Sequence, residues 1–470
     1  MIDLKNLTIS KARISLDSKE FSARELAQAY LDAIAEKNAD IHAYLEVFAD
    51  VLEQADRADA MMTEGKTFPL TGIPFAIKDN ILIEGRHVSA ASKILENYVA
   101  SYDATVIKLL KDQGAVFLGR TNMDEFAMGG STENSAYGVT KNPNDTSRVP
   151  GGTSGGSAAA VAGEMALVSL GSDTGGSIRQ PASFCGVVGI KGTYGSVSRY
   201  GLMSAVSSFD QIGPIARTVA DAEIVYNSIK GKDTNDATSV EGVFDTKIKM
   251  KIGVPQKFVR GGGVEKEVLE VFDQSIEKFK SLGYEIMDID LPNISLGLPA
   301  YYILNFAEIS SNLARYDGIR YGVREESSDI IDTYFKTRGH LLGKEVRRRI
   351  MLGAYVLSAG YYDAYYGKAN TLRDKIREDY KKAFEAVDCI LTPVAPTLPF
   401  KIGEKVSDPL SLYLEDVFTV GANLSGFPAL SMPGGWTKKD DKDLPVGIHL
   451  LGSAFAENTL FDIGKQFETL

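Results

Sequence analysis

Residues 151–177 read GGTSGGSAAAVAGEMALVSLGSDTGGS and contain two clusters of glycine and hydroxyl residues, 151–157 and 174–177. Glycine lets the backbone turn sharply and leaves amide N–H groups accessible to a ligand. A flexible linker has a similar composition, but core-type residues such as Met165 and Leu170 interrupt this segment. We therefore interpret it as a folded element whose hydroxyls are candidate nucleophiles and proton relays.

The overall composition is that of an ordinary globular protein. The chain has 470 residues, of which 44% are hydrophobic and 24% charged, and a formal net charge of −11. This negative charge argues against the chain being the main contact with nucleic acid or an anionic membrane. The sequence shows neither an apolar stretch of transmembrane length nor the pattern of a signal peptide. Two cysteines, Cys185 and Cys389, indicate no disulfide framework. We expect a cytoplasmic protein without a membrane partner.

Histidine chemistry finds little support in the sequence. The four histidines are scattered: His42, His87, His340 and His449. None has the spacing of a metal-binding motif, so we expect no metal site. The same scatter weakens a Ser-His-Asp triad, so the base that activates a serine here is expected not to be histidine.

Helical and strand-like patterns alternate along the chain. Apolar periodicity predicts helices near residues 22–34, with Ser22 as N-cap, and at 51–62, 105–113, 264–282 and 460–467. Short apolar runs predict strands at 75–80, 115–118, 249–254, 284–289 and 389–393. This alternation predicts an α/β protein with a mostly parallel or mixed sheet. Residues 231–246 are polar and predict a surface excursion, and no linker is long enough to force two domains.

Lys78 is the second informative feature of the chain. It ends the apolar run Phe75-Ala76-Ile77, where desolvation would lower its pKa and favour the neutral amine. A neutral buried amine can act as a general base. The alternative is a lysine that pairs with Asp79 at the end of a strand. Local sequence leaves both interpretations open.

Several motifs in order along the chain resemble the amidase signature family. They are TGIPFAIKD at 71–79, GGTSGGS at 151–157 and GSDTGGSIR at 171–179. Within that family, NMDEFAMGGSTENS at 122–135, RYDGIRYG at 315–322 and SAGYYDAYY at 358–366 resemble the A subunits of tRNA-dependent amidotransferases. The resemblance implies an α/β fold with a large mixed β-sheet core covered by helices on both faces. It also implies a single domain over residues 1–470, with a helical segment at about 1–65 packed on it.

The resemblance also implies a catalytic set built from a serine, a serine at a cis peptide bond and a lysine. By motif position, Ser177 is the nucleophile, Lys78 the base and Thr153 the relay. The family usually has serine at the relay position, so Ser154 is the alternative relay.

The second glycine cluster is expected to stabilise the oxyanion that forms when the nucleophile attacks. Backbone N–H groups of Thr174, Gly175, Gly176 and Ser177 are expected to form the oxyanion hole.

By the same resemblance, three residues outside the glycine-rich segment would hold glutamine. Arg349 is expected to bind its α-carboxylate, Asp416 its ammonium group, and Tyr301 is expected to line the pocket. The alternative for each is a solvated helix face. Their neighbours Arg348, Glu415 and Tyr302 compete for the same roles.

The implied function is that of a glutaminase subunit that hydrolyses glutamine to glutamate. Its ammonia would convert Glu-tRNA(Gln), Asp-tRNA(Asn) or both to the amidated forms. The resemblance implies a heterotrimer with the B and C subunits of the amidotransferase, in which mischarged tRNA is bound mainly by the partner subunit. It implies no cofactor on this chain, with ATP and Mg used by the partner.

Three other functions are weighed. A free-standing amidase acting on another small amide would share the catalytic set and differ in its pocket. A phosphate-binding or scaffold protein is disfavoured because neither glycine cluster continues into Gly-Lys-Ser/Thr. A cysteine glutaminase is disfavoured because neither cysteine has a paired histidine motif.

Overall fold

One large mixed β-sheet organises the protein. The computed structural model describes residues 2–242 and 249–469, so the end of the polar excursion predicted at 231–246 lies outside the described residues. The sheet has 11 strands in the order β1-β3-β2-β4-β6-β5-β10-β11-β9-β7-β8. β2 pairs in parallel with β3 and β4, whereas β4 and β6 pair antiparallel. The predicted α/β class with a mixed sheet is confirmed.

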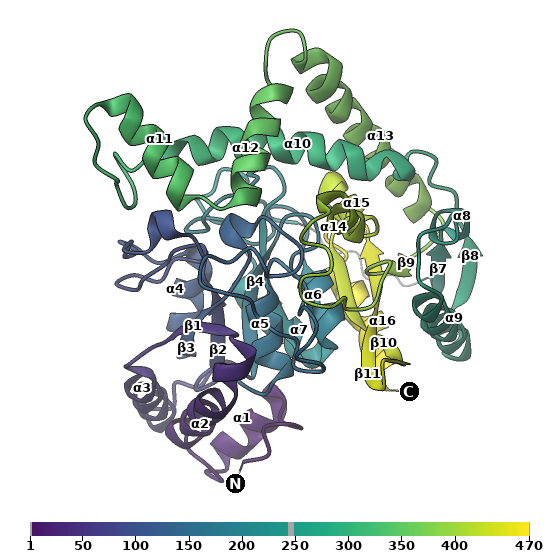
Figure 1. Ribbon diagram of the computed structural model, residues 1–470. Helices are drawn as coiled ribbons and strands as arrows, with labels where there is room; N and C mark the ends of the chain where they lie inside the picture. The colour runs from purple at the N-terminus through teal and green to yellow at the C-terminus, as the bar shows by residue number, and fades with distance from the viewer. Residues whose placement is uncertain (1, 243–248, 470) are drawn as a thin grey trace.

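The strands come from all parts of the chain. In chain order they are β1 (Tyr44–Val47), β2 (Pro74–Lys78), β3 (Val116–Thr121), β4 (Val168–Asp173), β5 (Val188–Lys191), β6 (Gln211–Ala216), β7 (Lys251–Val254), β8 (Glu285–Asp288), β9 (Cys389–Pro393), β10 (Ala429–Lys439) and β11 (Lys442–Gly452). β10 and β11 form a long antiparallel hairpin that links the two ends of the sheet (Figure 1).

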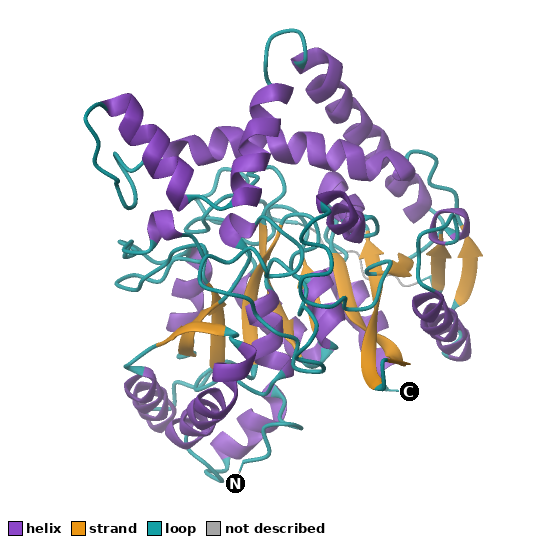
Figure 2. Cartoon of the chain, in the orientation of Figure 1, coloured by secondary structure: helices purple, strands orange, loops and turns teal. Residues whose placement is uncertain are grey.

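Helices cover both faces of the sheet (Figure 2). On β6, Ile215 packs in a small cluster with α5 (Gly155–Ala162) and α6 (Arg179–Cys185). The next residue, Ala216, belongs to the main cluster with α7 (Val219–Ile229) and α16 (Glu457–Glu468). Successive side chains of a strand point to opposite faces, so the two helix pairs lie on opposite sides.

Other helices complete the layers around the sheet. They are α1 (Ile9–Asp17), α2 (Ala23–Ile41), α3 (Val51–Thr63), α4 (Thr105–Asp112), α8 (Gln256–Val259) and α9 (Lys266–Ser281). Ser22 caps α2 through a capping box with Glu25, as the pattern near residue 22 predicts. None of the helices within residues 2–242 and 249–469 combines the length and the apolar character needed to cross a membrane.

A separate group of helices lies above the loops at one end of the central strands (Figure 1). It comprises α10 (Gly297–Asn312), α11 (Ile330–Leu341), α12 (Lys344–Val356) and α13 (Lys368–Phe384), with the short segments α14 (Pro409–Tyr413), η6 (Leu414–Asp416) and α15 (Val420–Ser425) nearby. Because α10 packs along α12 and α13, these helices form one layer over the strand ends.

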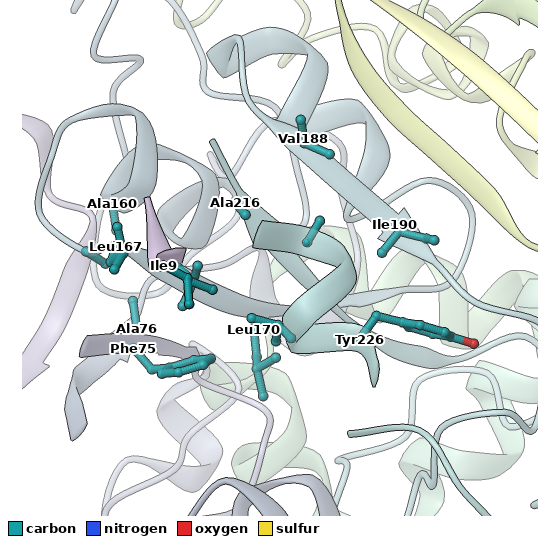
Figure 3. Packing of buried hydrophobic residues seen from close by; sticks show 14 of the residues in the cluster. Ile9, Phe75, Ala76, Ala160, Leu167, Leu170, Val188, Ile190, Ala216 and Tyr226 are labelled. Atoms are coloured by element: carbon teal, nitrogen blue, oxygen red, sulfur yellow. The ribbon is translucent and has the colours of Figure 1, made fainter. Parts of the chain in front are cut away.

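The core beneath that layer is tightly filled. Figure 3 shows Phe75 of β2, Leu170 of β4, Ile190 of β5 and Tyr226 of α7 packed together. Each of these side chains is fully buried. Close-packed interiors resist deformation, so this core gives the adjacent strands β2 and β4 a rigid base for the groups at their ends.

Candidate active site

Two neighbouring parallel strands end at the same place and carry the first functional groups. Lys78 is the last residue of β2 and Asp173 the last residue of β4. Both strands are buried along their whole length. The glycine-rich loop that precedes α5 lies against them, so residues 153 and 154 reach the end of β2.

The ammonium group of Lys78 is surrounded by hydroxyl groups. Its Nζ lies 2.7 Å from Thr153 Oγ1, 2.8 Å from Ser154 Oγ and 2.9 Å from Ser172 Oγ. The carbonyl oxygen of Ser172 is 3.2 Å away. Asn80 Nδ2 donates to Ser172 Oγ at 3.0 Å and fixes that hydroxyl from the other side.

Burial lowers the pKa of Lys78 to about 7, although Asp124, Asp173 and Asp210 oppose the shift. The neutral amine is therefore well populated near neutral pH. It has two N–H donors and one lone pair, so one neighbouring hydroxyl can donate its proton to Nζ.

Of the two candidate relays, only one hydroxyl has another bonded partner in the described part of the chain. Ser154 Oγ donates to Ser172 O at 3.1 Å. The hydroxyl of Thr153 is bonded to Lys78 alone within residues 2–242 and 249–469. The structure thus commits the proton of Ser154 and leaves that of Thr153 free to move.

The loop that carries Thr153 is held from several sides. The peptide bond between Gly152 and Thr153 is cis. The amide of Gly152 donates to Gln180 Oε1 at 2.8 Å. A Cβ on Gly152 would lie 2.2 Å from Asp124 Oδ2, so only glycine fits at this position. The close packing fixes the position of the Thr153 hydroxyl.

Ser177 lies beside this loop and is 8% exposed. Its carbonyl oxygen accepts from the amide of Ser154 at 3.1 Å, which joins the two glycine-rich clusters through the backbone. The amide of Gly176 donates to Asp173 Oδ1 at 3.0 Å and is not available as an oxyanion donor. No hydrogen bond within the described residues engages the amides of Thr174, Gly175 or Ser177.

Asp173 and Arg179 hold the Ser177 loop from beneath. They form an ion pair of 2.9 Å, and both side chains are fully buried. Burial alone would raise the pKa of Asp173, but the charge and hydrogen bonds of Arg179 hold it well below its usual range. Asn423 Nδ2 donates to the same carboxylate at 2.9 Å. This network connects the loop to α15.

A second cluster of polar groups lies in the helical layer. Arg349, on α12, is buried and pairs with Glu345 through Nε and Oε1 at 2.8 Å. Burial would lower the pKa of Arg349, but the opposite effects, led by that of the Glu345 carboxylate, are together larger, so the pKa is raised. The guanidinium also lies over the rings of Tyr302 and Tyr413, 5.7 and 5.2 Å from their centroids. It is therefore a permanent, oriented cation.

Asp416 lies close to that cation and is bonded to a tyrosine. Tyr302 Oη donates to Asp416 Oδ2 at 2.7 Å. Burial raises the pKa of Asp416 to about 7. A buried carboxylate of this kind becomes ionised when a cationic group binds beside it.

Tyr301 connects the helical layer to the Ser177 loop. A Cβ on Gly175 would lie 2.3 Å from the Tyr301 hydroxyl, so the tyrosine lies directly against the loop backbone. Thr419 Oγ1 donates to the carbonyl oxygen of Gly175 at 2.5 Å, and the Thr419 amide donates to Asp416 O at 3.1 Å. The polar cluster of the helical layer and the glycine loop are thus in direct contact.

The competing neighbours have other partners. Arg348 is 30% exposed and pairs with Glu345. Glu415 is buried and bonded to Lys405 and to Thr397. Tyr302, in contrast, contacts both Asp416 and Arg349. The structure brings Tyr301 and Tyr302 into the same site, one against the loop and the other against the charged pair.

Sequence reasoning missed several supporting residues. They are Asn80, Ser172, Glu345 and Asn423. Ser172 lies inside the quoted motif 171–179, which is a signal that could have found it. The others come from separate segments, and their contacts depend on tertiary packing. Among the described residues, no group of three or more His, Cys, Asp or Glu side chains could hold a metal ion.

Comparison with known proteins finds relatives that match nearly the whole chain. The family model described as Amidase matches residues 25–461. The A subunit of glutamyl-tRNA(Gln) amidotransferase from Desulfatibacillum aliphaticivorans is 51% identical over 474 residues, which cover 99% of this chain and 97% of that protein. The crystal structure of the A subunit of glutamyl-tRNA(Gln) amidotransferase from Thermotoga maritima has a TM-score of 0.83 and 42% identity, and covers 100% of this chain and 96% of that one.

A more distant structural neighbour has a different activity in its name. Native peptide amidase from Stenotrophomonas maltophilia has a TM-score of 0.79 and 28% identity, over 99% of this chain and 97% of that one. From the family match and the extent of these similarities, the chain belongs to the amidase family, in the branch of the glutamyl-tRNA(Gln) amidotransferase A subunits.

Proposed function

We propose that the chain is the glutaminase subunit of a tRNA-dependent amidotransferase. The observation that carries this proposal is the contact between Lys78 and Thr153, 2.7 Å long, beside the backbone of Ser177. It joins a lysine with a pKa of about 7 to a hydroxyl whose proton is free to move. Such a pair activates a serine without histidine.

In the proposed reaction, Ser177 Oγ attacks the side-chain carboxamide carbon of glutamine. Its proton passes to Thr153, whose own proton passes to the neutral amine of Lys78. The amides of Thr174, Gly175 and Ser177 stabilise the oxyanion. When the C–N bond breaks, the same relay returns a proton to the departing nitrogen, which leaves as ammonia. Water then attacks the ester on Ser177 and releases glutamate.

Glutamine is held by complementary charges in the helical layer. The guanidinium of Arg349 suits the α-carboxylate, and the carboxylate of Asp416 suits the α-ammonium group. Tyr301 lies against Gly175 and closes the pocket beside the reacting carbon. Recognition of the two α-groups in addition to the side-chain carboxamide would exclude simple amides.

We place the chain in the cytoplasm as a heterotrimer with the B and C subunits of the amidotransferase. The net charge of −11 argues that tRNA is bound mainly by a partner chain. The B subunit would use ATP and Mg to activate the carboxylate of Glu-tRNA or Asp-tRNA. The names of the relatives, which are about half identical over nearly the whole chain, support this assembly.

A free-standing amidase is the second candidate, favoured by the likeness to a peptide amidase. The deciding experiment measures glutamine hydrolysis by the purified chain with and without the subunits that copurify from its native cells. We expect a strong preference for glutamine and a partner-dependent transfer of ammonia to mischarged tRNA. Rapid turnover of diverse amides by the isolated chain, with no preference for glutamine, would favour the free-standing amidase.

A further inference from the structure

A buried carboxylate outside the catalytic set connects the catalytic loops to the helical layer. Glu125 is 2% exposed and lies in the segment after β3. Its Oε2 accepts from the amide of Gly343 at 2.7 Å, across 218 residues of sequence. Its Oε1 accepts from the hydroxyl of Ser92. Neither contact belongs to the proposed proton relay.

The contact with Gly343 fixes the start of the helix that carries Arg349. Gly343 is the N-cap residue of α12, and Glu345 in the first turn pairs with Arg349. A Cβ on Gly343 would lie 2.2 Å from Glu125 Oε2, so the carboxylate lies directly against the helix start. A shift of this contact would therefore move Arg349 relative to the bound substrate.

The other side of Glu125 faces the loops that hold the catalytic groups. Ser92 follows Ala91, whose amide donates to Asp79 Oδ2 at 2.9 Å. Asp79 is the residue directly after Lys78. The residue before Glu125 is Asp124, whose amide donates to the carbonyl oxygen of Thr153 at 3.4 Å. Glu125 thus lies where the lysine strand, the relay loop and α12 meet.

The backbone around this junction is held in an unusual conformation. Ala90, Ala91, Phe126 and Ala127 all have positive φ, between 49° and 59°. The amide of Phe126 donates to Ala90 O at 2.8 Å, so the two strained pairs contact each other. Left-handed backbone at non-glycine residues costs energy and persists at functional sites. The geometry of this junction is therefore specified, and not a by-product of loose packing.

We propose that Glu125 is a positioning residue for glutamine recognition. Its carboxylate sets the start of α12, and through it Arg349, relative to the loops that carry Lys78 and Thr153. This inference rests on the proposed glutaminase function. It makes Glu125 act on binding of the α-carboxylate and not on the chemical step.

The test uses the full chain together with the subunits that copurify with it. Glu125→Ala removes both acceptors. We expect it to raise KM for glutamine about 10- to 100-fold, the scale of a small misplacement, with kcat within about threefold. Calorimetry with L-glutamine in a Ser177→Ala background, where no turnover occurs, should show the same rise in Kd.

Two further variants separate positioning from bulk stability. Burial raises the pKa of Glu125 to about 7. A glutamine side chain substituted at position 125 is therefore a close mimic of protonated Glu125. Glu125→Gln keeps an acceptor for Gly343 and should leave Kd within about threefold of wild type. Gly343→Ala disturbs the contact from the helix side and should raise Kd as Glu125→Ala does.

Asp221 provides the matched control. Asp221, on α7, is also a buried carboxylate that accepts a backbone amide, but its partner is the amide of Ile9 at the start of α1, 3.0 Å away. Asp221→Ala should lower Tm without changing Kd for glutamine.

Unchanged glutamine binding in Glu125→Ala, or in Gly343→Ala should the first variant fail to fold, would overturn the inference. So would a fall in kcat with KM and Kd unchanged. Failure of the Ser177→Ala protein with native Glu125 to bind glutamine would instead refute the proposed function.

Discussion

The proposed catalytic centre and the proposed glutamine-recognition cluster are built from different parts of the fold. The centre combines Lys78 at the end of β2 with one glycine-rich segment, and its groups are buried against the ends of the central strands. The recognition cluster comes from α10, α12 and η6, whose residues span 301–416. The first depends on a rigid sheet and the second on the packing of a helical layer. Chemistry and substrate choice should therefore be separable by mutation.

The largest expected effect comes from variants that abolish the chemical step and leave glutamine binding intact. Ser177→Ala should lower kcat for glutamine at least about 10⁴-fold, because it deletes the nucleophile. Lys78→Ala should be nearly as damaging, since groups that act as a unit are not additive. Steady-state assays of ammonia release would measure both. Glutamine affinity and Tm of Ser177→Ala should stay near wild type, and substantial hydrolysis by this variant would contradict the assignment.

The relay is the next test of the catalytic centre. Thr153→Val keeps the shape and removes the hydroxyl, so kcat should fall by about two to four orders of magnitude. Thr153→Ser should keep activity. Ser154→Ala is the matched control, because the hydroxyl of Ser154 already donates to Ser172 O. An active Thr153→Val with an inactive Ser154→Ala would move the relay to Ser154.

A smaller effect is expected in the recognition cluster, and it should appear in KM. Arg349→Lys keeps the charge but loses the planar, bidentate fork, so KM for glutamine should rise about 10- to 100-fold with little change in kcat. Arg348→Lys is the control, since that side chain is partly exposed and, among residues 2–242 and 249–469, pairs only with the same Glu345. Equal effects in the two variants would contradict the placement of the α-carboxylate at Arg349.

Much of the fold could be predicted because its signals are local. The strand predicted at 389–393 coincides with β9, and the helix predicted at 105–113 with α4 (Thr105–Asp112). The hairpin of β10 and β11 was not predicted. The register shifts between Pro433 and Gly435, and the partner strand contains Pro445. Both features interrupt the apolar alternation that would indicate a strand. Strand order depends on tertiary packing and has no local signal.

The candidate site divides in the same way. Lys78, Thr153 and Ser177 stand in motifs that resemble the amidase family, and their expected roles follow from that resemblance. The choice between Tyr301 and Tyr302 could not be made from sequence, because adjacent helical residues point about 100° apart and a helix's rotation is set by its packing. In the structure both contribute: Tyr301 lies on the loop at Gly175 and Tyr302 bonds to Asp416.

The smallest expected effect is a difference in pH dependence between the two regions. Burial lowers the pKa of Lys78 to about 7 and raises that of Asp416 to about 7. Below that pH the lysine is a cation and cannot accept a proton, while the aspartic acid is neutral and cannot pair with an ammonium group. Both losses reduce kcat/KM for glutamine, which reports the free enzyme. It should therefore fall more steeply than about tenfold per pH unit on the acid side.

In the enzyme–substrate complex the ammonium group of glutamine keeps Asp416 ionised, so kcat should fall only about tenfold per pH unit, from Lys78 alone. Asp416→Asn removes one of the two groups, and its kcat/KM should take the shallower slope. Profiles of kcat and kcat/KM between about pH 5.5 and 8.5 would measure this. A kcat that does not change with pH would contradict Lys78 as a neutral base. An unaltered kcat/KM slope in Asp416→Asn would contradict the ammonium site while leaving the catalytic centre in place.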